Sequence, residues 1–277
     1  MSEEQRVIGL IAGGRQFPVL VAQGVKKAGH RLVVACFEGH SNMAAAAHAD
    51  VSAVLKLGKL GKLLEFFKKN GVQHVIMAGT IDKPKIMDVR HFDMRALKLI
   101  FKNKSKGDST ILGALTAELE SEGMRVVPAH IHVPDLLTPE GVLTKRSPTE
   151  QEWEDLRYAW KVAKELGRLD IGQCLVVREG IVAAVEALEG TDEAIRRGCK
   201  YGGENCVVVK VFKPGQEDRV DLPSAGTDTI RTMAEGKGSC LGIEAGRSLL
   251  FDREETLAVA EKAGICVVGL TPELLQG

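Results

Sequence analysis

The chain has 277 residues, of which 44% are hydrophobic and 27% are charged, as in an ordinary globular enzyme with a sizeable core. Lysine plus arginine and aspartate plus glutamate both total 37, so the formal net charge is zero. This balance argues against a nucleic-acid-binding protein, which needs a surplus of basic side chains. It also gives weak protection against self-association, so a homo-oligomer is compatible with the sequence.

The cysteines and the first residues bear on the cellular location. The six cysteines are scattered, mostly within apolar runs, and no two have CxxC spacing. We expect buried, reduced thiols, as in a cytosolic protein. The opening "MSEEQR" is acidic and polar, which predicts no signal peptide, and no uncharged apolar run approaches the roughly 20 residues of a membrane span. A cytoplasmic location is expected.

The first half of the chain alternates buried strands with amphipathic helices. Strands are predicted at 7–12, 31–37, 51–57, 74–78 and 125–128, and helices at 18–28, 60–70 and 109–121. Such alternation is typical of a parallel sheet covered on both faces. Residues 1–130 are therefore predicted to form a Rossmann-like N-terminal domain, and the Pro-, Gly- and Thr-containing residues 131–149 to form a linker.

Residues 150–277 are predicted to form a second, catalytic α/β domain with a mixed sheet. "CLVVREGIVAAV" has two apolar runs around a turn, which indicates a hairpin. Helices are predicted at 151–166, 191–197, 227–235 and 253–263, and further strands at 206–212, 241–244, 248–251 and 266–270.

Two glycine-containing loops follow predicted strands of the first domain. In "GLIAGGRQFP" the strand ends at Gly13 and Gly14, and in "IMAGTIDKP" it ends at Gly79 and Thr80. Small residues with backbone N–H groups before a helix suit anion binding, although a tightly packed turn has the same pattern. Because parallel strands end at one edge of a sheet, we expect both loops to line a ligand cleft. The GxGxxG and GxxxxGK[ST] fingerprints are absent.

The stretch "KPGQEDRVDLPSAGTDTI" in the second half is a candidate for the chemistry. Asp221 stands between Val220 and Leu222, where an apolar strand is expected to end. A carboxylate there costs free energy unless it has a partner, and a divalent cation is one such partner. Lys213, Gln216 and Arg219 precede it and could bind phosphate oxygens. His130 and His132 form an H-x-H pair that would share one face of a strand, but packed or solvated histidines fit better than a metal site because no acidic residue is near.

Several long motifs resemble one family along nearly the whole chain. They are "GLIAGG…FP", "AGTIDKP", "KGDSTIL", "GRLDIGQ", "VEALEGTDEAI", "VFKPGQEDRVDLPSAGTDTI" and "GIEAGRSLLFDRE". Together they look like the UDP-2,3-diacylglucosamine pyrophosphatases of the type found where the calcineurin-like enzyme is missing. The resemblance implies a cytoplasmic, Mg²⁺-dependent step of lipid A synthesis in Gram-negative bacteria, with peripheral inner-membrane contact at most. The products would be 2,3-diacylglucosamine 1-phosphate (lipid X) and UMP, with the substrate held between two domains.

The resemblance also implies roles for particular residues. The family's essential aspartate falls on Asp221, either as a Mg²⁺ ligand or as a general base. Many relatives have a third glycine where this chain has Arg15. The predicted substrate contacts are Ala12, Gly13, Gly14, Gly79, Thr80, Gln173, Lys213 and Gln216.

Two other functions stay open at this point. One is a nucleotide-dependent oxidoreductase on the Rossmann-like half, although no acidic residue is well placed for a ribose. The other is a non-catalytic carrier of a lipid or a nucleotide.

Overall fold

The computed structural model describes residues 5–81, 92–102, 108–215, 219–220 and 222–276. The chain divides into two compact units. The first comprises the described residues up to Pro134 together with residues 219–220, and the second comprises the others. Within the part of the chain that is described, none of the helices combines the length and the apolar character needed to cross a bilayer.

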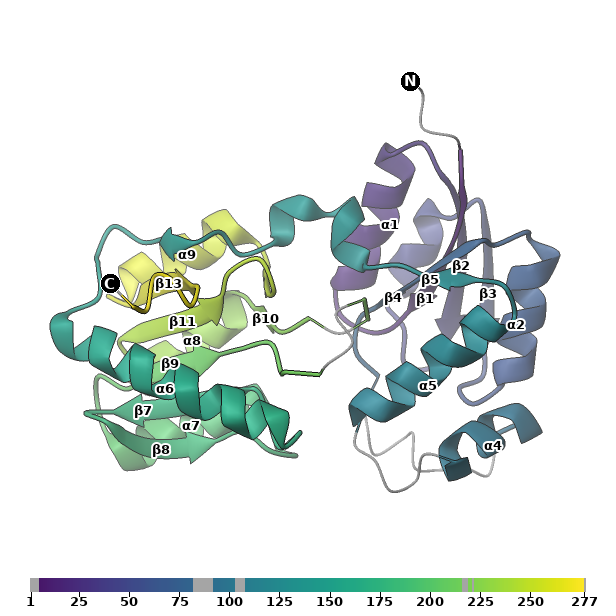
Figure 1. The fold of residues 1–277 in the computed structure, drawn as a ribbon. Coiled ribbons are helices and arrows are strands. Elements are labelled where there is room, and N and C mark those ends of the chain that lie inside the picture. Colours follow the sequence, from purple (N-terminus) through teal and green to yellow (C-terminus); the bar gives the residue numbers. More distant parts are fainter. Residues whose placement is uncertain (1–4, 82–91, 103–107, 216–218, 221, 277) are drawn as a thin grey trace. The chain divides into compact units, whose positions relative to one another are not determined.

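The first unit contains a five-stranded sheet in which neighbouring strands are all parallel (Figure 1). Its order is β3 (Val51–Leu55), β2 (Arg31–Phe37), β1 (Val7–Ala12), β4 (His74–Ala78) and β5 (Arg125–Val126). This 3-2-1-4-5 order is that of a Rossmann-like sheet, in which ligands bind beyond the carboxyl ends of the strands.

Helices cover both faces of this sheet, and β1, β2 and β4 are therefore buried almost throughout. On one face lie α1 (Phe17–Lys27), the 3₁₀ segment η1 (Met43–His48) and η3 (Ala129–His132). On the other lie α2 (Leu60–Lys69), α4 (Met94–Lys102) and α5 (Asp108–Ser121).

The second unit contains a six-stranded mixed sheet (Figure 1). Its order is β6 (Gly141–Val142), β13 (Cys266–Leu270), β11 (Cys240–Glu244), β9 (Val207–Lys210), β7 (Cys174–Arg178) and β8 (Ile181–Val185). The three central strands β13, β11 and β9 are parallel, whereas β6, β7 and β8 each pair antiparallel. A short parallel pair, β10 (Ser224–Ala225) with β12 (Leu249–Leu250), stands beside it.

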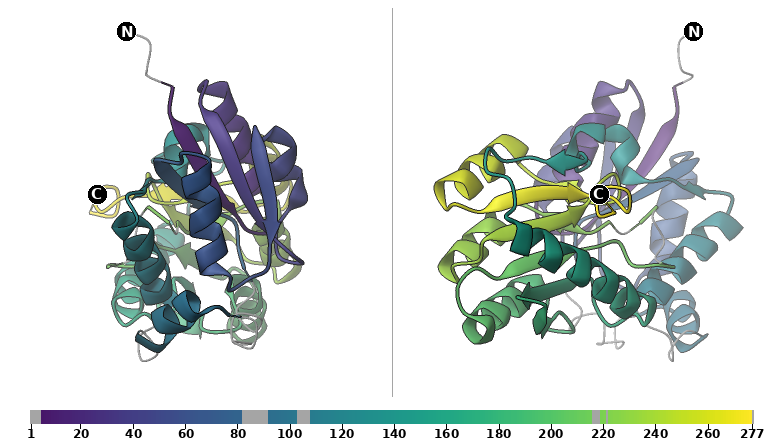
Figure 2. Two further views of the ribbon diagram at one scale, coloured as in Figure 1. Left: turned by 90° about the vertical axis from the view of Figure 1, so that its right-hand side faces the viewer. Right: turned by 60° about the vertical axis from the view of Figure 1, so that its left-hand side comes forward.

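Two hydrophobic layers enclose the second sheet. Helix α6 (Glu150–Arg168) packs on one face and is seen crossing the strands in Figure 2. Helices α7 (Thr191–Gly202), α8 (Thr227–Glu235) and α9 (Arg253–Lys262) cover the other face. The 3₁₀ segment η4 (Pro134–Leu136) spans the division, because the second unit starts at Asp135.

The predicted fold class is confirmed, and the hairpin of β7 and β8 turns at Glu179 and Gly180, both with positive φ. The boundaries predicted at 130 and 150 differ from the observed division, because residues 135–149 contain β6 and pack within the second unit. All six cysteines are buried and free, as expected. His130 and His132, whose rings would share one face if they stood on a strand, lie in the 3₁₀ segment η3 instead, and the rings of His132 and His30 meet edge to face at 5.6 Å.

Candidate functional site

The carboxyl edge of the first sheet carries the two glycine loops predicted to bind substrate. Gly14 and Thr80 form an isolated antiparallel bridge that ties the two loops together. The amide of Gly13 donates to the Ala78 carbonyl oxygen and that of Gly14 to the Thr80 carbonyl oxygen, both at 2.7 Å. These two N–H groups are therefore engaged within the protein, which differs from the expectation that they face an anion. Thr80 and Gly79 are exposed, and Gly13 is buried.

Close approach of the loops explains why glycines stand here. A Cβ atom on Gly13 would lie 2.7 Å from the Gly79 carbonyl carbon and 2.8 Å from the Thr80 carbonyl oxygen. Gly79 has φ +88°, and its Cβ would lie 2.5 Å from the Gly14 carbonyl oxygen. Both positions require glycine for the backbone itself. Arg15 has φ +64°, so the position where relatives are expected to carry a third glycine is also left-handed.

A third loop, after β2, braces the glycine loops and was not singled out from the sequence. Ser41 Oγ donates to the Ala12 carbonyl oxygen at 2.5 Å, and the Asn42 amide donates to the Gly13 carbonyl oxygen at 2.9 Å. Ala12 is fully buried. His40 Nδ1 is buried, and none of the described residues forms a hydrogen bond with it. The turn-forming "GHSN" run was the available signal for this loop.

The second sheet presents a polar carboxyl edge of its own. Strands β9 and β11 end there, and the antiparallel strand β7 begins there. Gln173, just before β7, accepts from the Val211 amide at 2.9 Å through its main-chain oxygen. Its side-chain Oε1 is buried and has no hydrogen-bond partner among the described residues. Lys213 follows β9 and donates to Asp170 Oδ1 at 2.7 Å. Two of the predicted substrate contacts, Gln173 and Lys213, thus lie at one edge of this sheet.

A buried ion pair organises this edge. Glu244, the last residue of β11, accepts from Lys164 Nζ of α6 at 2.5 Å and from the Phe212 amide at 2.7 Å. Lys164 Nζ also donates to the Phe212 carbonyl oxygen at 2.9 Å. The Arg247 guanidinium lies over the Phe212 ring, 4.3 Å from its centroid. These contacts fix the residue immediately before Lys213.

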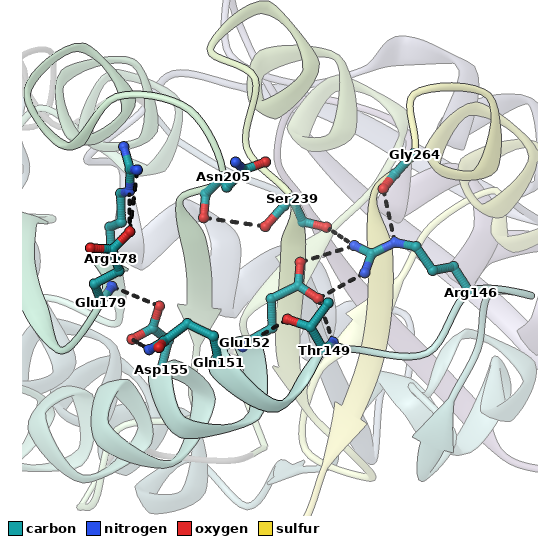
Figure 3. A pocket seen from close by; sticks show the side chains of 10 residues that line it. All are labelled: Arg146, Thr149, Gln151, Glu152, Asp155, Arg178, Glu179, Asn205, Ser239 and Gly264. Carbon is teal, nitrogen blue, oxygen red and sulfur yellow. Dashed lines mark hydrogen bonds and ion pairs between the residues drawn. The ribbon is translucent and has the colours of Figure 1, made fainter.

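The opposite, amino edge of the same sheet holds a pocket of about 430 Å³ (Figure 3). Arg146 binds both carboxylate oxygens of Glu152 and donates to the Ser239 and Gly264 carbonyl oxygens. Asp155 accepts from the amides of Glu179 and Gly180. The charged groups in this pocket are satisfied by one another and by main-chain atoms, and it lies away from the carboxyl ends of the parallel strands. We interpret it as a structural network.

Comparison with known proteins identifies the family. Residues 7–136 match the model of the LpxI N-terminal domain, and residues 139–268 match that of the LpxI C-terminal domain. The "UDP-2,3-diacylglucosamine pyrophosphatase LpxI" of Caulobacter vibrioides is 36% identical over 281 residues, covering 97% of this chain and 99% of that protein. This chain belongs to the LpxI family.

Other likenesses of this LpxI-family chain are partial. A "Bifunctional purine biosynthesis protein PurH" of Anaeromyxobacter is 33% identical over 135 residues, which are 46% of this chain and 22% of that protein. Among solved structures, an ADP complex of N5-carboxyaminoimidazole ribonucleotide synthetase covers 69% of this chain and 34% of its own, at 17% identity and a TM-score of 0.29. A TM-score this low supports no inference about function.

Two of the predicted LpxI-site residues, Gln216 and Asp221, lie outside the described residues. Among the described ones, no group of three or more His, Cys, Asp or Glu side chains could hold a metal ion. The buried Glu244 is engaged by Lys164, and the buried Glu186 accepts from Thr191 Oγ1 at 2.9 Å. The described residues do not assemble a metal site by themselves, so the Mg²⁺ prediction depends on Asp221.

Proposed function

We propose that this chain hydrolyses UDP-2,3-diacylglucosamine to 2,3-diacylglucosamine 1-phosphate (lipid X) and UMP. The observation that carries the proposal is the 36% identity to the Caulobacter pyrophosphatase over 97% of this chain and 99% of that protein. A likeness of this extent includes both units, and it favours hydrolysis over the oxidoreductase and the carrier considered above. In the reaction, water attacks the sugar-side phosphorus, the bond to the bridging oxygen breaks, and UMP leaves.

The two carboxyl edges offer groups that suit such a substrate. Lys213 and the exposed Thr80 are candidates for polar contacts, and Gly79 brings backbone to the surface beside Thr80. Gln173 Oε1, which is buried and has no partner in the described part of the chain, can accept a hydrogen bond from an N–H or O–H group of the ligand. Ala12, Gly13 and Gly14 would act mainly by shaping the loop, because their backbone groups are bonded within the protein. Gln216 completes the proposed set.

Asp221 is the proposed catalytic carboxylate, as a Mg²⁺ ligand or as a general base. Mg²⁺ commonly binds through one or two carboxylates together with substrate phosphates and water, so a single aspartate is sufficient in principle. When bound, Mg²⁺ would neutralise the charge that develops on the leaving phosphate. The proposal also includes a cytoplasmic location with peripheral inner-membrane contact at most. It further includes assembly of the chain into a homo-oligomer.

Release of UMP from UDP-2,3-diacylglucosamine tests the proposal directly. The wild-type protein is expected to release UMP in Mg²⁺ and to lose that activity in EDTA. Asp221→Ala should lower kcat by about three powers of ten or more while the substrate still binds. Asp228→Ala is a matched control, because Asp228 is 81% exposed and pairs only with Arg231 of its own helix among the described residues. Intact substrate after incubation with the wild type in Mg²⁺ would refute the proposed activity. Normal turnover by Asp221→Ala would refute the catalytic role of Asp221.

A further inference from the structure

Lys210 is a buried lysine at the carboxyl edge of the second sheet. It is the last residue of β9, and only 7% of its surface is exposed. It lies opposite Cys174 in the β7–β9 register, directly beside the start of β7. Lys210 Nζ donates to the main-chain oxygen of Ser224 at 2.7 Å. In the sequence, Ser224 follows Asp221 by three residues, so the ammonium group lies where the "VDLP" motif ends.

The partners of Lys210 differ from those of the other lysines at this edge. Lys164 pairs with Glu244 at 2.5 Å, and Lys213 pairs with Asp170 at 2.7 Å. Among the residues described, no carboxylate lies within ion-pair distance of Lys210 Nζ. The buried Glu186, which follows β8 on the far side of β7, accepts from Thr191 Oγ1 and from the Gln173 amide instead. Among the described residues, the three N–H donors of Lys210 Nζ therefore have one neutral acceptor, the Ser224 main-chain oxygen.

A buried ammonium group with one neutral acceptor is costly in the absence of a counter-ion. An anion at this edge would supply the missing charge and accept the remaining N–H groups in strong, charge-assisted bonds. We propose that Lys210 binds a phosphate oxygen of the pyrophosphate group, as a substrate-binding residue in addition to Lys213. This inference rests on the proposed function for the identity of the anion, whereas the geometry points only to a phosphate-like anion at this edge.

Binding of UDP, in buffer with Mg²⁺, tests the inference without turnover of a lipid substrate. Lys210→Met and Lys210→Gln should weaken UDP binding about ten- to a hundredfold, the loss expected for a buried charge-assisted bond. Binding of uridine, which carries no phosphate, should not change. Lys210→Gln is the sharper variant, because its amide can still donate to the Ser224 oxygen while the charge is lost. Lys237→Met is the control, since Lys237 is 69% exposed and pairs with Glu204.

A purely structural role predicts different results. Lys210→Gln would then bind UDP like the wild type, and Lys210→Met would lower the melting temperature. Our inference predicts that Lys210→Met melts at the wild-type temperature or above it, because removing an uncompensated buried charge relieves strain on the fold. Unchanged UDP affinity in a folded Lys210→Gln protein, or no UDP binding by the wild type, would overturn the inference.

The two proposals fail in different ways. If the wild type binds UDP through Lys210 but releases no UMP from UDP-2,3-diacylglucosamine, the proposed function is wrong and the Lys210 assignment holds. If the wild type hydrolyses that substrate and Lys210→Gln both binds UDP and turns over equally well, the assignment is wrong and the function holds.

Discussion

At the scale of single residues, this protein buries several charged side chains, and their partners indicate what each one does. Glu244 and Lys164 satisfy each other and also bond to the main chain of Phe212. Such a pair holds the chain in place before Lys213. Lys210, whose partner among the described residues is one main-chain oxygen, is better suited to an external anion. The sequence places Glu244 and Lys210 in predicted strands and Lys164 in a predicted helix, but it does not reveal their partners, which come from distant segments.

Glu244→Gln should lower the free energy of unfolding by about 2 kcal/mol. The substitution keeps an acceptor for the Phe212 amide but leaves Lys164 without a counter-charge, which is strongly destabilising in a buried setting. We expect less than the roughly 3–5 kcal/mol typical of breaking a fully buried ion pair, because the Lys164 side chain is 23% exposed. Denaturant unfolding measures the change. Glu204→Gln removes the acid of an exposed Lys–Glu pair and should leave the midpoint unchanged; equal midpoints for both variants would count against this role of Glu244.

At the scale of elements, local signals predicted most helices and strands of the second unit. Helix α8 and strand β13 have the predicted bounds, because capping and turn residues flank them. Helix α7 extends five residues beyond its predicted end at Arg197. Gly198 lies inside this helix, and a Cβ there would lie 2.5 Å from Val176, so this glycine permits close helix–strand packing. Helix α4 was not predicted, and tertiary packing on α2 and α5 accounts for it.

Contacts between segments distant in sequence also limit what could be predicted of the candidate site. Gln173 and Lys213 come from segments forty residues apart, and the structure brings both to one sheet edge. Motif resemblance selected them, whereas Ser41, Asn42 and Lys210 were missed because their roles depend on which strands are neighbours. For Gly13 and Gly14 the local pattern suggested too much. It predicted an anion site, but their amides bond to the chain at the end of the neighbouring strand β4.

The start of α6 gives a pH-dependent prediction. Thr149 and Glu152 form a capping box, and Arg146 binds the Glu152 carboxylate. Burial opposes ionisation of Glu152, but hydrogen bonds from Arg146 and the Thr149 amide outweigh it and lower its pKa. A lowered pKa in the folded state stabilises the fold above the unfolded-state pKa of about 4.3, and this stabilisation is lost as the pH falls through the folded-state value.

Glu152→Gln separates the charge from the cap, because glutamine also serves in a capping box. At pH 7 the variant should unfold about 1 kcal/mol more easily than the wild type, since the charge-assisted bonds to Arg146 are lost. The difference should shrink as the pH falls below about 4. Chemical denaturation between pH 7 and pH 3 measures it. A difference that stays constant over this range would show that the Glu152 charge does not contribute.

At the scale of the whole molecule, each unit has its own sheet with a hydrophobic layer on either face. The division is not contiguous in sequence. Arg219 donates to Glu120 Oε1 at 2.7 Å and Val220 packs with the core of the first unit, although both lie far along the chain. Composition suggested a linker at 131–149, but β6 and the residues after it pack on the second sheet. Pro and Gly in that stretch mark turns within the unit.

Two fragments distinguish the observed boundary from the predicted one. Residues 135–277 should fold alone and unfold cooperatively, because they contain the whole six-stranded sheet and both of its layers. Residues 150–277 lack β6, the Thr149 cap and Arg146, which bonds to Glu152 and to the Ser239 and Gly264 carbonyl oxygens. The shorter fragment should therefore be less stable by about 3 kcal/mol, the sum expected for a lost cap and lost charge-assisted bonds. Circular dichroism during urea unfolding measures both, and equal midpoints would show that residues 135–149 act as a linker after all.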